Sequence, residues 1–194
     1  MGAIFQSLGR TIIAGVVILV VIMAIAGTFG KISEHVWAAF FMRYLHVLSG
    51  VMWIGLLWYF NFVQTPSMPK IPDEQKPAVS KVIAPAALFW FRWAALATVV
   101  TGLLVASMNG YLGAALALTP GVRPIGIGMW LALVMAFNVW FIIWPNQKKA
   151  LGMVQVDADE KAKAARMAML TSRFNTMLSI PMLYCMVAQQ NAGL

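Results

Sequence analysis

The 28 residues from Trp37 to Gln64 constrain the fold most, because they form a nearly unbroken apolar and aromatic run that contains one arginine and one histidine. With a rise of about 1.5 Å per residue, a helix of this length exceeds the roughly 30 Å hydrocarbon core of a bilayer. A long transmembrane helix is therefore expected. Steps of three and four residues return to one face of such a helix. The residues on that face are Arg43, His46, Gly50, Trp53, Leu57, Asn61 and Gln64.

The composition extends this interpretation to the whole chain. Of its 194 residues, 61% are hydrophobic and only 10% are charged, against roughly 25% charged residues in ordinary soluble domains. This predicts an all-α integral membrane helical bundle. The net charge of +8 comes from basic residues at the ends of apolar runs, which is typical of membrane orientation and excludes nucleic acid as a partner. The single Cys185 excludes an intrachain disulfide, and without a CxxCH motif any haem is bound non-covalently.

Apolar runs separated by prolines and charges predict one transmembrane domain over residues 1–194, with about five spans. We expect them at about 11–29, 37–64, 85–108, 126–145 and 167–189. Residues 65–84 hold four prolines and are expected to form a solvated loop. Pro145 should end the fourth span, and Pro181 should kink the last.

The Lys and Arg residues of the loops predict the orientation, since nine lie on one side and two on the other. The nine are Arg10, Lys70, Lys76, Lys81, Lys148, Lys149, Lys161, Lys163 and Arg166, and the two are Lys31 and Arg123. The N-terminus is then cytoplasmic and the C-terminus periplasmic, in a multi-pass protein of the bacterial inner membrane.

Three arginines lie within predicted spans, whereas all six acidic residues lie in loops. This argues against a carboxylate proton relay. Arg92 and Arg173 lie near the expected cytoplasmic end of their spans, at about the height of three asparagines. Together they form a candidate anion or substrate site of Arg92, Asn138, Arg173, Asn175 and Asn61. Alternatively, the arginines extend to lipid headgroups and the asparagines bond neighbouring helices.

Arg43 and His46 share a face in the expected periplasmic half of the second span and form the sharpest local signal. One interpretation is a b-type haem with His46 as iron ligand, Arg43 as propionate partner, Gly50 allowing close approach and Trp53 as a wall. His35 is too far along the same helix to bind the same iron, so the second ligand would be a histidine of another chain or one of the 14 methionines. Copper, with Met42 and His46 as ligands, is a second interpretation. A third is a structural histidine bonded to a carbonyl or hydroxyl of another helix.

Several blocks of the sequence resemble the membrane domain of the bacterial urate hydroxylase (urate oxidase) family. The first reads LHVLSGVMWIG and continues as LWYFNFVQTP, over residues 45–66. The others are WFRW at residues 90–93, AFNVWFIIWPNQKK at 136–149, SRFN at 172–175 and LSIP at 178–181. The HxxxGxxWxG portion of the first block is less specific, because it is similar to histidine-bearing helices of other small haem or copper membrane families.

The resemblance implies a membrane redox subunit. In that family the membrane domain is followed by a c-type cytochrome domain that accepts electrons from urate oxidation. The sequence ends at Leu194, so we expect the electron acceptor to be a separate periplasmic cytochrome c. The alternative is a non-catalytic accessory or scaffold subunit of a larger respiratory or photosynthetic membrane complex, whose aromatic faces pack against partner helices.

Overall fold

The computed structural model describes residues 2–191, and within this range the chain is helical, with no strand. It forms two compact units, Met1–Phe41 and Met42–Leu194. Four helices are long and apolar enough to cross a membrane: Leu8–Ile25, His35–Lys70, Lys76–Met108 and Arg123–Ala150. The prediction of an all-α protein with membrane-spanning helices is confirmed at this level.

The first unit contains α1 (Gly2–Phe5), α2 (Leu8–Ile25), η1 (Thr28–Lys31) and the first residues of α3 (His35–Trp58). Ser7 precedes α2 in an extended conformation, and Gly27 follows it with a φ of 66°. That left-handed conformation favours glycine and ends the helix. None of the residues of α2 is buried. Helix α2 begins three residues before the predicted span at 11–29 and ends four residues before the end of that span.

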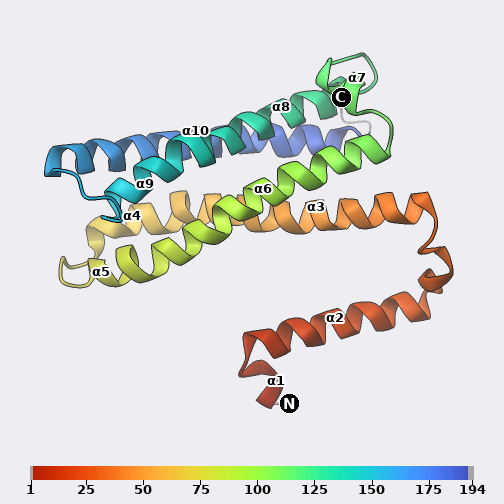
Figure 1. The fold of residues 1–194 in the computed structure, drawn as a ribbon, viewed down its shortest axis with the longest axis horizontal. Helices are drawn as coiled ribbons and strands as arrows, with labels where there is room; N and C mark the ends of the chain where they lie inside the picture. The colour runs from red at the N-terminus through yellow and green to blue at the C-terminus, as the bar shows by residue number, and fades with distance from the viewer. Residues whose placement is uncertain (1, 192–194) are drawn as a thin grey trace. The chain divides into compact units, whose positions relative to one another are not determined.

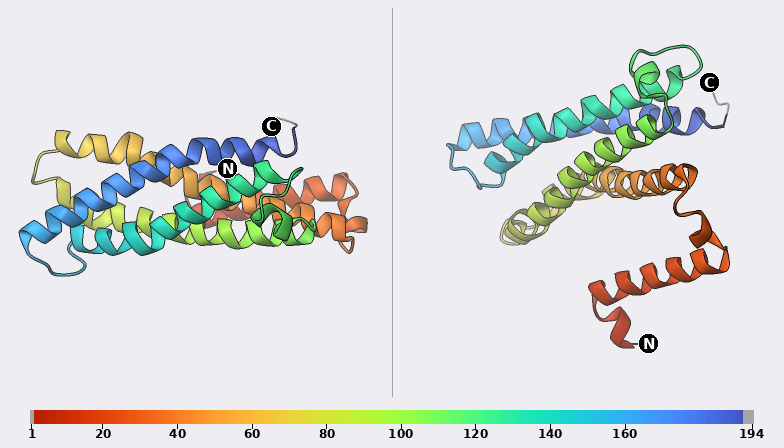
Figure 2. Two further views of the ribbon diagram at one scale, coloured as in Figure 1. Left: turned by 90° about the horizontal axis from the view of Figure 1, so that it is seen from above. Right: turned by 45° about the vertical axis from the view of Figure 1, so that its right-hand side comes forward.

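Long helical segments build the second unit, in which α10 packs along α8, η5 and α9 (Figures 1 and 2). The chain continues from α3 through η2 (Tyr59–Gln64), α4 (Thr65–Ser67) and η3 (Met68–Lys70). The next segment is α5 (Lys76–Ala78), η4 (Val79–Ile83) and α6 (Ala84–Met108). After the short α7 (Leu112–Leu116) come α8 (Arg123–Phe137), η5 (Asn138–Ile143), α9 (Trp144–Ala150) and α10 (Ala158–Ala188).

The predicted solvated loop at 65–84 is wrong in its extent, because most of that stretch is helical and only residues 71–75 lie outside helices. Pro145 likewise does not end the fourth span, which continues to Ala150. In each case the helix widens into a π-helical segment just before a proline: η2 ends two residues before Pro66, η4 before Pro85 and η5 before Pro145. Proline lacks an N–H and its ring clashes with the carbonyl four residues earlier. The wider turn accommodates both effects.

The fifth predicted span corresponds to α10, which begins at Ala158 rather than near residue 167 and contains Pro181. Asp157 caps it by accepting a hydrogen bond from the Glu160 backbone N–H at 2.7 Å. This helix is not among the four that are apolar enough to cross a membrane by composition. Its first turns carry charged residues, and its buried positions include Asn175 and Ser179.

The main core of the second unit lies towards the π-helical end of the bundle. Its largest fully buried apolar side chains are Trp53, Phe91, Leu57, Met135, Ile143 and Val139. A smaller cluster around Ala106, Ala115, Ile125 and Met129 closes the other end, where α7 packs on α8. Between α3 and the α8–α10 pair, the packing leaves a cavity.

Candidate cofactor cavity

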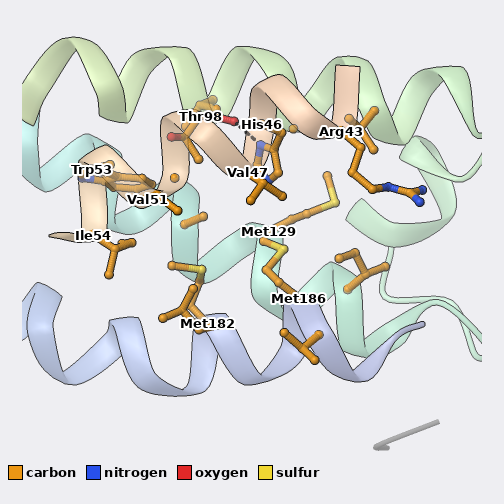
Figure 3. A pocket seen from close by; sticks show the side chains of 18 of the residues that line it. Arg43, His46, Val47, Val51, Trp53, Ile54, Thr98, Met129, Met182 and Met186 are labelled. Carbon is orange, nitrogen blue, oxygen red and sulfur yellow. Dashed lines mark hydrogen bonds between the residues drawn. The ribbon is translucent and has the colours of Figure 1, made fainter. Parts of the chain in front are cut away.

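The cavity lies within the second unit and has a volume of about 650 Å³, which is within the range of ligand sites. Residues of α3, α6, α8 and α10 line it, and most of them are apolar. Figure 3 shows His46 and Arg43 on the α3 side, with Met129, Met182 and Met186 lining the cavity from α8 and α10. The four residues predicted as a cofactor site, Arg43, His46, Gly50 and Trp53, all line this cavity.

His46 is anchored to α6 through its ring nitrogen Nδ1. This atom lies 2.9 Å from the Thr98 carbonyl oxygen and 3.3 Å from Thr101 Oγ1. A carbonyl oxygen only accepts, so Nδ1 carries the hydrogen and donates it. In a neutral imidazole, Nε2 then holds the lone pair. This is the arrangement in which metal-bound histidines are usually held, with one nitrogen donating to a carbonyl and the other free to bind.

Gly102 of α6 makes the position of the His46 ring possible. A Cβ atom built on Gly102 would lie 2.8 Å from His46 Cε1 and 3.2 Å from Nδ1. The glycine was not predicted from the sequence, since it lies 56 positions away in the chain from the histidine that it accommodates. Gly50, which was predicted to allow close approach, has more room: its nearest added contact is Thr98 Cγ2 at 3.9 Å.

Arg43 lies at the rim of the cavity (Figure 3), and Gln190, just beyond α10, also lines the cavity. When the Gln190 amide is oriented with its oxygen towards Arg43, that oxygen accepts from the two terminal guanidinium nitrogens at 3.2 and 3.3 Å. Tyr111, between α6 and α7, also lines the cavity. Burial raises the pKa of the Tyr111 hydroxyl, and the positive charge of Arg43 partly opposes this shift. The rim is therefore polar and cationic, whereas the interior is apolar.

Trp53 lies in the wall of the cavity and is fully buried. Its indole Nε1 has no hydrogen-bond partner among residues 2–191. A buried N–H without an acceptor is costly, since it forfeits its bond to water.

The asparagines predicted as part of an anion site form hydrogen bonds between helices in the structure. Asn138 donates to Asn175 Oδ1 at 2.8 Å, and Asn175 donates to the Met135 carbonyl at 2.9 Å, so this buried pair joins η5 and α8 to α10. Asn61 donates to Ser172 Oγ at 2.8 Å and links η2 to α10. Arg173 is exposed.

Arg92 has a different environment from the asparagines. Its guanidinium carbon lies 3.6 Å from the centre of the Trp144 ring. This is a close cation–π contact between α6 and α9. The asparagines thus join helices, while Arg92 stacks on an aromatic ring. From the sequence, these residues could be placed only at a similar depth in the membrane.

Comparison with known proteins gives one family. Residues 122–192 match the family described as urate oxidase, N-terminal. No curated protein and no solved structure gave a match. The chain is therefore related to the N-terminal region of the urate oxidase family over α8, η5, α9 and α10. The matched segment supplies one wall of the cavity, including Met129, Met182 and Met186, and His46 lies outside it.

Proposed function

We propose that the chain is a redox subunit of the bacterial inner membrane, related to urate-oxidising proteins, which binds b-type haem through His46. The observation that carries the proposal is the Nδ1 hydrogen bond to the Thr98 carbonyl beside a large apolar cavity. Haem when bound supplies one-electron transfer, and we propose that the acceptor is a separate periplasmic cytochrome c. Urate as the electron donor rests on the family match alone.

The donor set of the cavity fits a haem. His46 Nε2 would bind the haem iron, and the Thr98 carbonyl holds the ring in the tautomer that leaves this nitrogen free. Met129, Met182 and Met186 offer thioether sulfurs from the facing helices. Arg43 supplies a cation at the rim that can exchange Gln190 for a propionate carboxylate. Groups of three or more His, Cys, Asp or Glu able to hold a metal ion are absent from residues 2–191. We propose that one of these methionines acts with His46.

We further propose five membrane spans, with α10 as the fifth. At one end, Lys149 of α9 pairs with Glu160 of α10. At the other end, Gln189 accepts from the Ile125 N–H at 3.3 Å and donates to the Gly121 carbonyl at 2.9 Å. Because these contacts lie at the two ends of the helix Arg123–Ala150, α10 extends along the whole length of that helix. If that helix crosses the bilayer, α10 crosses it too.

The visible absorption spectrum of the purified protein tests the haem proposal. We expect a Soret band in the wild-type protein, its loss or shift in His46→Ala, and its retention in His35→Ala, which removes the only other histidine. Thermal unfolding of both variants checks that they remain folded. Urate added to the oxidised protein should then reduce the haem in the wild type.

A wild-type protein that carries no haem when expressed in a haem-replete host would overturn this proposal, as would a Soret band unchanged in His46→Ala. The same outcome, together with co-purification in a large assembly, would favour the accessory or scaffold alternative. The partly buried Nδ1–carbonyl bond would then serve only to join α3 and α6.

A further inference from the structure

A second candidate site lies away from the cavity, where two cations meet on one indole ring. The guanidinium carbon of Arg92 lies 3.6 Å from the centre of the Trp144 ring, and Lys148 Nζ lies 5.6 Å from it. The ion pairs found among residues 2–191 are Lys76–Asp73 and Lys149–Glu160. Arg92 and Lys148 thus share a ring and belong to neither pair.

Helix geometry explains why the two cations converge. Side chains on an α-helix tilt towards its N-terminus. The tilt of Arg92 on α6 therefore leads towards the Ala84 end of that helix. The tilt of Lys148 on α9 leads back towards Trp144, which begins the same helix one turn earlier, and this helix runs in the opposite direction to α6 (Figure 1). Both positive charges therefore lie close to the same indole ring. Like charges held together without a carboxylate favour a bound anion.

The length of the helices places this site at the membrane surface. The end of α6 at Met108, the start of α8 at Arg123 and the end of α10 at Ala188 lie together at one end of the bundle (Figure 1). A hydrocarbon core takes about 20 helical residues. Counting that number from those ends reaches the neighbourhood of residue 88 on α6 and 143 on η5. Arg92, Trp144 and Lys148 therefore lie within about one turn of the boundary, at headgroup height.

We propose that Arg92, Trp144 and Lys148 form a binding site for the phosphate of an anionic phospholipid. The planar guanidinium, kept in place by the indole ring, can donate two parallel hydrogen bonds to phosphate oxygens. Lys148 adds a second charge from the water side. The exposed aromatic side chains of Phe89, Trp90 and Trp93 on the same part of α6 supply the interfacial ring surface next to the acyl chains.

Lipid-dependent stability of the full chain tests this site. Wild type, Arg92→Gln, Lys148→Gln and Lys149→Gln are reconstituted in phosphatidylcholine nanodiscs containing increasing fractions of phosphatidylglycerol, and the thermal unfolding temperature is recorded. Lys149→Gln is the matched control. It removes the same charge at the next residue of the chain, but from a side chain that already pairs with Glu160. Each Lys or Arg near an anionic membrane surface contributes to the binding free energy, and the loss of one such charge should weaken phosphatidylglycerol binding about fivefold. A parallel series adds soluble glycerol phosphate.

We expect phosphatidylglycerol to stabilise wild type and Lys149→Gln equally, and to stabilise Arg92→Gln and Lys148→Gln much less. Equal losses in all three variants would overturn the proposal, since they would indicate a diffuse charge effect. Unchanged stabilisation in Lys148→Gln would do the same, and this variant alone suffices if Arg92→Gln fails to fold. An equal response to soluble glycerol phosphate would reject a lipid as the source of the phosphate. None of these outcomes depends on haem binding at His46.

Discussion

Single atoms decide how His46 is held. The ring donates from Nδ1 to the Thr98 carbonyl and its Cε1 lies close to Gly102, so its position depends on the absence of one methyl group on α6. The residue that carries the candidate function is visible in the sequence, as an isolated histidine in an apolar helix. The residue that permits its orientation is not, because an ordinary glycine in an apolar helix gives no sign of what lies opposite.

Gly102→Ala tests this dependence. The added Cβ would lie 2.8 Å from His46 Cε1, which forces the ring away from the Thr98 carbonyl. We expect a loss of about 1–3 kcal/mol from overpacking, partly offset by the better helix propensity of alanine. Chemical denaturation in detergent measures the stability, and the absorption spectrum reports the ring position.

Gly50→Ala is the control for that variant. It makes the same change in a helix that lines the same cavity, but its Cβ would meet its nearest neighbour at an ordinary 3.9 Å. We expect it to be as stable as wild type or slightly more stable. Equal stabilities of the two variants would contradict the close packing of His46 against Gly102.

At the scale of elements, the prolines make the ends of the helices difficult to predict from the sequence. The sequence correctly indicates helical membrane-type segments, because hydropathy and length suffice for that. It does not reveal that the helices before Pro66, Pro85 and Pro145 widen into π-helical turns and continue. A proline rule based on the lost backbone bond predicts a helix end. In the structure, the π-helical turn before each proline accommodates the missing hydrogen bond, and the helix continues beyond the apolar run.

The asparagine pair shows a second limit of the sequence. Helix register places Asn138 and Asn175 at similar heights, but it does not determine that they face each other. In the structure they do, and together with the Met135 carbonyl they satisfy each other across buried helix faces. Amides that bond each other in this way hold helices together, and an anion would have to compete with those bonds.

A double-mutant cycle tests the asparagine pair. Asn175→Leu leaves the buried Asn138 amide without its acceptor, so each single variant should lose stability, by about 1–3 kcal/mol. The double variant Asn138→Leu with Asn175→Leu should lose less than the sum, with a coupling energy of about 0.6–1.7 kcal/mol, as for other hydrogen bonds between membrane helices. Equilibrium unfolding in mixed micelles measures all four proteins. Strict additivity would show that the 2.8 Å contact contributes nothing.

The whole molecule has an expected orientation that follows from its charges. Nine of the eleven loop Lys and Arg residues are assigned to one side, which the positive-inside rule makes cytoplasmic. Five crossings, with α10 as the last, then bring the Gly121 turn and Gln189 to the periplasm. In this orientation, Arg43 and Gln190, which line the cavity, would lie near the periplasmic side. This is where a soluble cytochrome c would have to approach, so the redox proposal requires this orientation.

Cysteine labelling in intact cells tests the orientation directly. The native Cys185 is the single cysteine and is buried, so its background reaction with a membrane-impermeant maleimide should be low. Thr119→Cys lies in the turn between α7 and α8, and Gln75→Cys lies between η3 and α5 at the opposite end of the helices. We expect Thr119→Cys to be labelled in intact cells and Gln75→Cys only after permeabilisation. The reverse pattern would place Arg43 and the cavity mouth in the cytoplasm and would exclude a periplasmic cytochrome as the acceptor.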